Sequence, residues 1–198
     1  MRGLYAITPD VVDTALLARR VEQALAAGVA MLQYRNKMLS KEKRLLQAKE
    51  LAPIARGYGV PFIVNDDVEV ALAVGANGVH VGKDDGDLAT ARSKLSGKIL
   101  GASCYDDLEK ARAAVKAGAD YIAFGSVFPS PTKPQAVRAP LSLFGANLGV
   151  PLCAIGGVTI ANAPALIAAG ASLLAVISDL FDAPDIAARA GEYRKLFQ

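Results

Sequence analysis

The chain has 198 residues, of which 53% are hydrophobic, so it suits one domain (residues 1–198) with a sizeable core and is too apolar to be disordered. It contains 22 lysines and arginines against 19 aspartates and glutamates, and so small an excess argues against a nucleic-acid-binding protein. No apolar run approaches the roughly 20 residues of a membrane span, and Cys104 and Cys153 lack partners at metal-ligand spacing, so we expect a cytoplasmic protein without membrane contact.

Glycines mark a repeated unit along the chain. Seven of them follow a helix-like segment and precede a short apolar run: Gly28, Gly59, Gly75, Gly97, Gly118, Gly149 and Gly170. A helix often ends at a residue in the left-handed conformation, which glycine adopts without a steric penalty. These glycines therefore predict seven junctions at which a helix is followed by a strand.

Eight runs have the almost continuous apolar character of strands that are covered on both faces. In chain order they are 4–8 (LYAIT), 30–34 (AMLQY), 61–65 (PFIVN), 78–82 (GVHVG), 98–103 (KILGAS), 121–128 (YIAFGSVF), 151–157 (PLCAIGG) and 172–178 (SLLAVIS). Before Gly118, the residues Leu108, Ala111, Ala114 and Val115 share one face of a helix. That pattern is typical of an amphipathic helix packed on a sheet.

The alternation of helices and strands predicts a parallel sheet. With a last helix near residues 184–197, it favours an α/β, single-domain (β/α)8 TIM barrel. An open, doubly wound sheet is the alternative, but no G-x-G-x-x-G motif opens a helix after the first strand. The reactive groups of a (β/α)8 barrel lie at the C-terminal ends of its strands, which is where we look for a site.

Polar residues and glycines follow nearly every predicted strand. They are Thr8, Gln33, Arg35, Lys37, Asn65, Asp66, Asp84, Asp85, Ser103, Ser130, Thr132, Lys133, Gly156, Gly157 and Ser178. Some have a structural alternative, since Asn65 and Asp66 also suit the N-cap of a following helix. The same holds for Asp84 and Asp85, although Asp87 is the more natural cap there.

Gln33, Arg35 and Lys37 stand at alternate positions around the end of the second strand. Alternate side chains of a strand point to the same face, so we expect the three to converge over the mouth of the barrel. Two permanent positive charges beside an amide indicate that an anion binds there.

A phosphate site is predicted after the last two strands. Gly156 and Gly157 follow the seventh strand, and Ile177 and Ser178 follow the eighth, where this fold often binds phosphate through backbone N–H groups. Glycines that only ease a turn are the alternative explanation.

A second anion is indicated by Arg35, Lys37 and Lys133. The last of these lies in the segment 128–140, which has four prolines and which we expect to fold over the mouth as a lid. Asp66 and Asp85 would repel an anion unless a divalent cation lay between them, and Mg²⁺ prefers such hard oxygen ligands together with substrate phosphates. A diphosphate, one Mg²⁺ and these side chains would be nearly neutral together.

Seven motifs, in order and nearly from end to end, make the chain resemble the thiamine-phosphate synthase family. They are LYAITPD, LQYRNK, VNDDVEVALAVGANGVHVGKDD, GASCY, ADYIAFGSVFPSPTKP, AIGGVT and AVIS. The resemblance implies a (β/α)8 barrel and a transferase. In the implied reaction, hydroxymethylpyrimidine diphosphate loses pyrophosphate and its pyrimidinylmethyl group passes to the ring nitrogen of hydroxyethylthiazole phosphate. In the family the leaving group is thought to depart first.

The resemblance also implies a role for each site residue. Gln33 would bind the pyrimidine, and Asp66 and Asp85 would bind Mg²⁺. The diphosphate would be held by Asn65 and by the four residues expected to help it leave, Arg35, Lys37, Ser103 and Lys133. The thiazole phosphate would be bound by Ser130, Thr132, Gly157, Ile177 and Ser178.

Some positions depart from the family pattern. Tyr105 stands where many relatives have histidine, Lys83 replaces a common glutamine, and Ser130 replaces a frequent threonine while keeping the hydroxyl. His80, the one histidine of the sequence, is expected to be structural rather than catalytic. A thiazole tautomerase and a non-catalytic thiamine-phosphate-binding barrel remain alternatives, and a homo-oligomer is left open.

Overall fold

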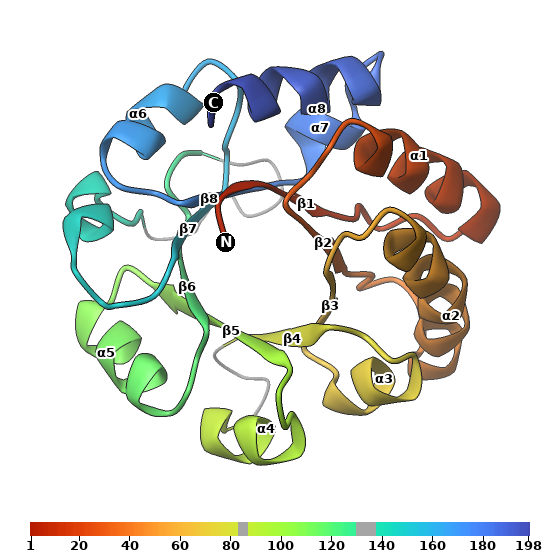
Figure 1. Cartoon of the computed structure of the whole chain (residues 1–198), viewed down its shortest axis with the longest axis horizontal. Helices are drawn as coiled ribbons and strands as arrows, with labels where there is room; N and C mark the ends of the chain where they lie inside the picture. Colours follow the sequence, from red (N-terminus) through yellow and green to blue (C-terminus); the bar gives the residue numbers. More distant parts are fainter. Residues whose placement is uncertain (83–86, 130–137) are drawn as a thin grey trace.

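The protein is described by a computed structural model over residues 1–82, 87–129 and 138–198. Its strands lie parallel in chain order and close into a barrel, because β1 pairs with both β2 and β8 (Figure 1). They are β1 (Gly3–Ile7), β2 (Met31–Tyr34), β3 (Phe62–Asn65), β4 (Gly78–Val81), β5 (Ile99–Tyr105), β6 (Tyr121–Phe124), β7 (Leu152–Ile155) and β8 (Leu173–Val176). The predicted (β/α)8 barrel is confirmed, and the open sheet is excluded.

Helices surround the barrel on its outside (Figure 1). In the described ranges they are α1 (Thr14–Ala26), α2 (Lys41–Gly57), α3 (Val68–Ala73), α4 (Leu88–Lys94), α5 (Leu108–Lys116), the 3-10 helix η1 (Leu141–Gly145), α6 (Ala163–Ala168), α7 (Ser178–Phe181) and α8 (Ile186–Lys195). None of them combines the length and hydropathy that a bilayer crossing requires.

The seven predicted junction glycines all have a positive φ, between 65° and 113°. Six of them follow an α-helix, as expected. The segment before Gly149 differs from the other six. It contains η1, a 3-10 helix of five residues between Pro140 and Pro151, where the other units have an α-helix.

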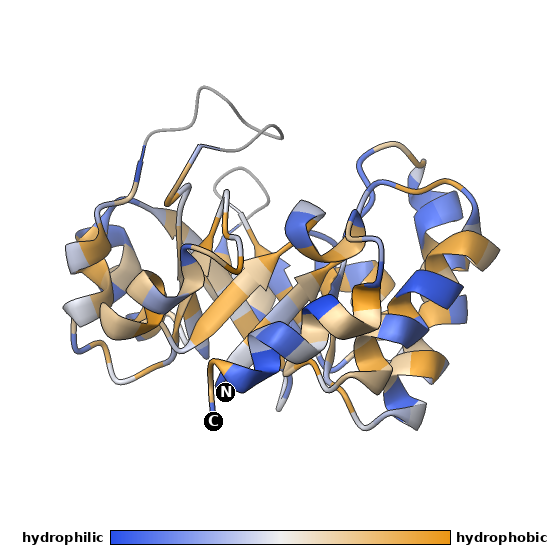
Figure 2. Ribbon diagram, turned by 90° about the horizontal axis from the view of Figure 1, so that it is seen from above, coloured by the Kyte–Doolittle hydropathy of each residue, from blue (hydrophilic) through white to orange (hydrophobic). Residues whose placement is uncertain are grey.

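The core has two parts. The larger lies between the barrel and the helices, where the buried faces of Ala111 and Ala114 in α5 confirm the predicted apolar stripe. Figure 2 shows the strands coloured mainly as hydrophobic and the hydrophilic residues on the helices around them. The smaller part fills the barrel itself and consists of Tyr5, Ile7, Met31, Ile63, Tyr121, Ala123, Cys153, Leu173 and Ala175.

Gly101 in β5 leaves room for one of these interior side chains, that of Tyr121. A Cβ atom at this position would lie 2.1 Å from Cζ and 2.3 Å from the hydroxyl oxygen of Tyr121. The ring of Tyr121, in the neighbouring strand β6, therefore crosses β5 over the bare backbone of Gly101 and reaches His80 in β4. The hydroxyl of Tyr121 is thereby placed inside the barrel, within hydrogen-bond distance of Tyr5 and His80.

Candidate active site

A chain of buried hydrogen bonds spans the barrel interior. Gln33 Nε2 donates to the hydroxyl of Tyr5 at 2.7 Å, and this hydroxyl lies 2.8 Å from that of Tyr121. The Tyr121 hydroxyl is 2.8 Å from Nδ1 of His80, whose Nε2 is 2.8 Å from Oγ of Ser103. Five strands thus contribute one group each, and Gln33 and Ser103 form the two ends.

Burial keeps the members of this chain uncharged. It lowers the pKa of His80 to about 4, against a smaller opposing effect of Asp66. Burial likewise raises the pKa of the Tyr5 and Tyr121 phenols. The interior therefore presents neutral donors and acceptors near neutral pH, and His80 is a hydrogen-bonded interior residue, in line with its expected structural character.

Arg35 is oriented by residues at the end of β1. Its Nη1 donates to both carboxylate oxygens of Asp10, at 3.1 and 3.0 Å, and its side chain is only 18% exposed. The buried hydroxyl of Thr8 accepts from the Arg35 backbone N–H and donates to its carbonyl, both at 2.8 Å. Asp10 also accepts the backbone N–H of Lys37 at 2.7 Å. The loop after β2 is thereby fastened to the loop after β1.

The predicted reason for this convergence needs correction. β2 ends at Tyr34, so only Gln33 points as strand alternation requires, and it is buried in the barrel. Arg35 and Lys37 lie beyond the strand, and their directions are set by the carboxylates of Asp10 and Asp66. Ion pairing, rather than pleating, decides where the two positive charges lie.

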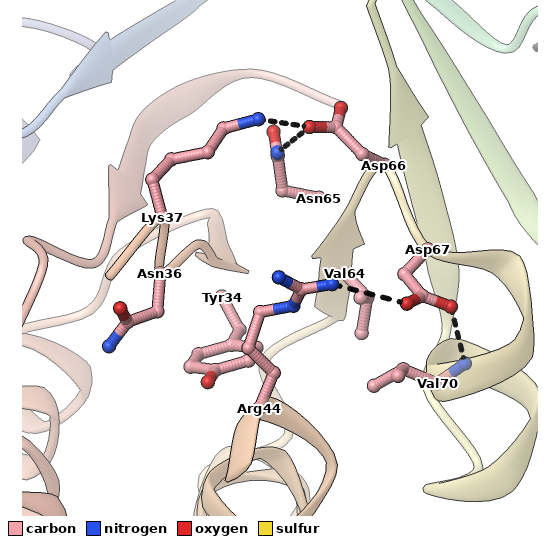
Figure 3. A pocket seen from close by; sticks show the side chains of 9 residues that line it. All are labelled: Tyr34, Asn36, Lys37, Arg44, Val64, Asn65, Asp66, Asp67 and Val70. Atoms are coloured by element: carbon pink, nitrogen blue, oxygen red, sulfur yellow. Dashed lines mark hydrogen bonds and ion pairs between the residues drawn. The ribbon is translucent and has the colours of Figure 1, made fainter. Parts of the chain in front are cut away.

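Lys37 reaches across to the end of β3 (Figure 3). Its Nζ lies 2.6 Å from Oδ2 of Asp66, and the side-chain amide of Asn65 donates to the same oxygen. Asp66 has a φ of 63°, unusual for a residue with a side chain, and its backbone N–H donates to the carbonyl of His80. Backbone strain of this kind is typical of functional positions, where surrounding contacts hold it in place.

The helix-cap alternative for Asn65 and Asp66 is excluded. Asp67 caps α3 by accepting the N–H of Val70, just as Asp87 caps α4. Asp67 also lies 3.6 Å from the guanidinium of Arg44, and these two residues, with Lys37, line a pocket of about 170 Å³ (Figure 3). The carboxylate of Asp66 does not cap α3 and is instead bonded to Lys37 and Asn65.

The ends of β7 and β8 lie side by side, since these strands are paired. Gly156 and Gly157 have φ values of 94° and 66°, and a Cβ atom would lie 2.2 Å from Ser126 Oγ at the first and 2.4 Å from the carbonyl of Pro129 at the second. Ile177 is the N-cap of α7, and Ser178 is its first residue. The structure thus brings the described members of the predicted phosphate site to adjacent strand ends.

Tyr105 ends β5 and is 38% exposed, with a φ of 56°. The ammonium of Lys110 lies 4.9 Å from the centre of its ring. Its phenol therefore forms part of the surface around the mouth.

Several predicted residues lie outside the described part of the chain. They are Lys83, Asp84, Asp85, Ser130, Thr132 and Lys133, together with most of the expected lid. At the edges of that segment, the N–H of Phe128 donates to the carbonyl of Gly156 and that of Ala139 to the carbonyl of Ser126. The described flanks of 128–140 are therefore joined to the loops at the mouth.

The sequence analysis did not find Asp10, Tyr5 and Tyr121. Asp10 is visible in the motif LYAITPD as a carboxylate just after a strand, which is a signal that could have been used. The two tyrosines look like ordinary core residues, because nothing in their neighbours indicates that their hydroxyls meet across 116 residues of sequence.

Of the predicted metal-binding pair, only Asp66 lies in the described ranges. No group of three or more histidine, cysteine, aspartate or glutamate side chains in those ranges is arranged to hold a metal. Asp66 nevertheless offers a hard carboxylate oxygen, and its contact with the Lys37 ammonium shows that a cation fits against it. A magnesium ion held by one or two carboxylates and by substrate oxygens suits this donor set.

Comparison with known proteins assigns the family. Residues 4–180 match the family model described as thiamine monophosphate synthase. The chain belongs to the thiamine monophosphate synthase family. A thiamine-phosphate synthase of Aromatoleum aromaticum is 58% identical over 201 residues, covering 100% of this chain and 97% of that protein. One from Bordetella avium is 54% identical over 197 residues, covering 95% of this chain and 91% of the relative.

Solved structures agree with this membership in the thiamine monophosphate synthase family. A thiamine phosphate pyrophosphorylase from Pyrococcus furiosus has a TM-score of 0.86 and 35% identity, covering 98% of this chain and 95% of that one. A 3-hexulose-6-phosphate synthase superposes over 100% of both chains with a TM-score of 0.75 but only 18% identity. That second likeness concerns the fold alone.

Proposed function

We propose that the protein is a thiamine-phosphate synthase, a transferase that joins the pyrimidinylmethyl group of hydroxymethylpyrimidine diphosphate to the nitrogen of hydroxyethylthiazole phosphate and releases pyrophosphate. One observation supports the proposal above all, the group of charged and polar side chains at the strand ends. Arg35 and Lys37 are oriented there by the carboxylates of Asp10 and Asp66, and Asn65 also donates to Asp66. The family membership supports it, since 58% identity extends over the whole chain.

The pyrimidine would lie over the buried end of the hydrogen-bonded chain. Gln33 is 2% exposed and its amide is already held by Tyr5, so it is rigid before the substrate arrives. An amide oxygen and an N–H side by side match the amino group and the ring nitrogen of an aminopyrimidine. Gln33 would therefore fix the orientation of the ring.

The diphosphate would be bound by Arg35, Lys37, Asn65 and Ser103, together with Lys133. Loss of pyrophosphate leaves a cation on the pyrimidinylmethyl carbon and builds negative charge on the departing oxygens. Donors and positive charges fixed around those oxygens stabilise that charge as it develops. No proton needs to be removed for this step, which agrees with an interior of neutral groups.

Asp66 and Asp85 would hold Mg²⁺. When bound, the ion supplies positive charge to the leaving pyrophosphate. Lys37 now neutralises Asp66, so we propose that its ammonium turns from this carboxylate to the phosphate oxygens when the substrate enters. The lysine side chain is 54% exposed, which leaves it room to move.

The thiazole phosphate would bind at the ends of β7 and β8. Gly157, Ile177 and Ser178 offer backbone N–H groups and a hydroxyl there, and Ser130 and Thr132 would add further donors. Anchoring the phosphate at this edge would direct the thiazole nitrogen to the pyrimidinylmethyl cation in the middle of the mouth.

We also propose that residues 1–198 form one domain and that the protein works in the cytoplasm. Two free, buried cysteines suit a reducing compartment. Burial raises the pKa of the Cys104 thiol to about 11, so this group is protonated and unreactive there.

The test is a coupled assay with both precursors. We expect thiamine phosphate and pyrophosphate to form only with Mg²⁺, and turnover of Asp66→Asn to fall by about a hundredfold or more, as for loss of a group that acts on developing charge. Glu50→Gln, which removes an exposed carboxylate from α2, is the matched control and should keep full activity. Tautomerase turnover without coupling, or binding without turnover in the parent protein, would instead support the alternative readings.

A further inference from the structure

We propose that the buried chain from Gln33 to Ser103 has a single direction, and that Tyr5, Tyr121 and His80 are positioning residues. In this direction Tyr5, Tyr121 and His80 each donate a hydrogen bond to the next member of the chain, which ends at Ser103. The Ser103 hydroxyl then has its own proton free to donate to an anion at the mouth, while the Gln33 carbonyl oxygen faces the pyrimidine. The identity of these two ligands rests on the proposed function, whereas the direction itself rests on the chain alone.

The direction follows from counting protons. Gln33 Nε2 only donates, so the oxygen of Tyr5 accepts from it and the one Tyr5 proton is directed to the oxygen of Tyr121. The Tyr121 proton is then directed to Nδ1 of His80. A neutral histidine has one N–H, so its proton lies on Nε2 and is donated to Ser103 Oγ.

The protonation states needed for this count are those that the hydrogen bonds require. A doubly protonated His80 would donate from both ring nitrogens and leave one tyrosine proton without an acceptor in the chain, so the ring is neutral. Burial also raises the pKa of both phenols, which keeps them protonated. Each of the three inner groups then has one proton to give and accepts one in return. Among the described residues, His80 is the hydrogen-bond partner of the Ser103 hydroxyl, so the serine proton remains available.

The reverse direction would satisfy the same buried groups but suit the substrate poorly. If the Gln33 amide were turned round, Ser103 would donate to His80, and the tyrosines would donate toward the amide oxygen. Ser103 would then present lone pairs to a phosphate oxygen, which is itself only an acceptor. Gln33 would present two N–H groups to a pyrimidine that offers both a donor and an acceptor.

The pyrimidine and the diphosphate of one substrate molecule therefore require the same direction of the hydrogen-bonded chain. The orientation that lets Gln33 bind the pyrimidine is also the one that leaves Ser103 able to donate to the diphosphate, because the three residues between them fix both ends. Because a buried polar group left without a partner costs more free energy than a typical hydrogen bond contributes, a break in the middle would affect both ends. The chain would thus favour a pyrimidine and a diphosphate that belong to the same molecule.

The single histidine of the sequence makes the direction measurable without turnover. In protein labelled with ¹⁵N-histidine, the nitrogen chemical shifts of His80 distinguish the Nε2–H from the Nδ1–H tautomer. We expect the neutral Nε2–H tautomer near pH 7, both alone and with inorganic pyrophosphate and Mg²⁺. The Nδ1–H tautomer, or a mixture of the two in the presence of pyrophosphate, would overturn the proposal even if the enzyme is active.

A kinetic comparison tests the positioning role. Tyr121→Phe keeps the ring but interrupts the chain, so we expect the KM for the pyrimidine diphosphate to rise by about tenfold and kcat to fall, with the KM for the thiazole phosphate unchanged. Tyr193→Phe is the matched control, since it removes another buried hydroxyl, one bonded to Asp179 at 2.7 Å. It should leave the KM for the pyrimidine diphosphate as in the parent.

Equal KM values for the pyrimidine diphosphate in parent and Tyr121→Phe protein would also overturn the proposal. If the Tyr121→Phe variant does not fold, the tautomer of the parent protein still decides the direction. If the parent forms no thiamine phosphate, the proposed function fails while the tautomer measurement keeps its meaning. The two proposals can therefore be rejected separately.

Discussion

At the scale of single residues, the site depends on pairs that orient one another before any substrate is bound. Asp10 holds the guanidinium of Arg35, and Thr8 holds its backbone. These contacts join residues 25 and 27 positions apart, so they depend on two loops being brought together. Strand-end position therefore indicated Arg35 as a site residue, whereas the carboxylate that aims it emerges only in three dimensions.

His80 predicts a dependence of stability on pH. Burial lowers its pKa from 6.5 to about 4, so between these values the unfolded chain binds a proton that the folded protein does not. Stability is therefore lost as the pH falls below about 6.5, and we expect this residue to account for about 2 kcal/mol between pH 7 and pH 5. Urea unfolding at the two pH values measures the loss.

The control for this prediction is His80→Gln, which removes the titrating ring and retains a polar side chain. Carboxylates that titrate in the same range contribute equally to both proteins. The loss of stability should therefore be smaller in the variant than in the parent by about the amount assigned to the histidine. An equal loss in both would show that His80 does not titrate as burial requires.

At the scale of helices and strands, most of the fold could be predicted from the glycines at the junctions between a helix and the next strand. They indicated each unit because a left-handed residue ends a helix whatever it packs against, and all seven indeed have positive φ. The segment before Gly149 differs, since the described helix there, Leu141–Gly145, is a 3-10 helix of five residues. The crossing of Tyr121 over Gly101 was beyond sequence reasoning, since it depends on the pairing of β5 with β6.

This crossing predicts a large effect of a small change. Gly101→Ala would place Cβ 2.1 Å from the Tyr121 ring, so the ring or the strand must move, and we expect the free energy of unfolding to fall by about 3 kcal/mol. Chemical denaturation provides the measurement. Shortening the blocking side chain in Gly101→Ala/Tyr121→Leu should recover part of the loss.

Gly191→Ala in α8 provides the opposite control. No atom lies within 4 Å of a Cβ built there, and alanine favours a helix over glycine by about 1 kcal/mol. The protein should become slightly more stable. A loss at Gly101→Ala no larger than the change at Gly191→Ala would argue against the tight crossing.

At the scale of the whole molecule, ligand binding and folding are linked, because the mouth is assembled from loops of many strands. We expect pyrophosphate with Mg²⁺ at about 100 times its Kd to stabilise the fold by about 2.7 kcal/mol. For a chain of this length that corresponds to a rise of about 5 to 10 °C in Tm, measurable by scanning calorimetry.

The contribution of Mg²⁺ is isolated by repeating the measurement with pyrophosphate and a chelator. In the parent protein, removal of the metal should abolish most of the rise in Tm. In Asp66→Asn the shift should be small with or without the metal, because the carboxylate proposed to hold the ion is gone. A metal-dependent shift of full size in that variant would exclude Asp66 as a ligand.

The pairing of β1 with β8 also has a consequence for how the protein is made. Residues Gly3–Leu173 and Ala6–Val176 are register partners, so the first strand finds its second neighbour only after almost all of the barrel has been translated. Until then both edges of the growing sheet are unpaired, and such edges attract other strands. Contacts between residues so far apart also form slowly. Emergence of β8 from the ribosome is thus the event that ends the exposure of the nascent chain to aggregation.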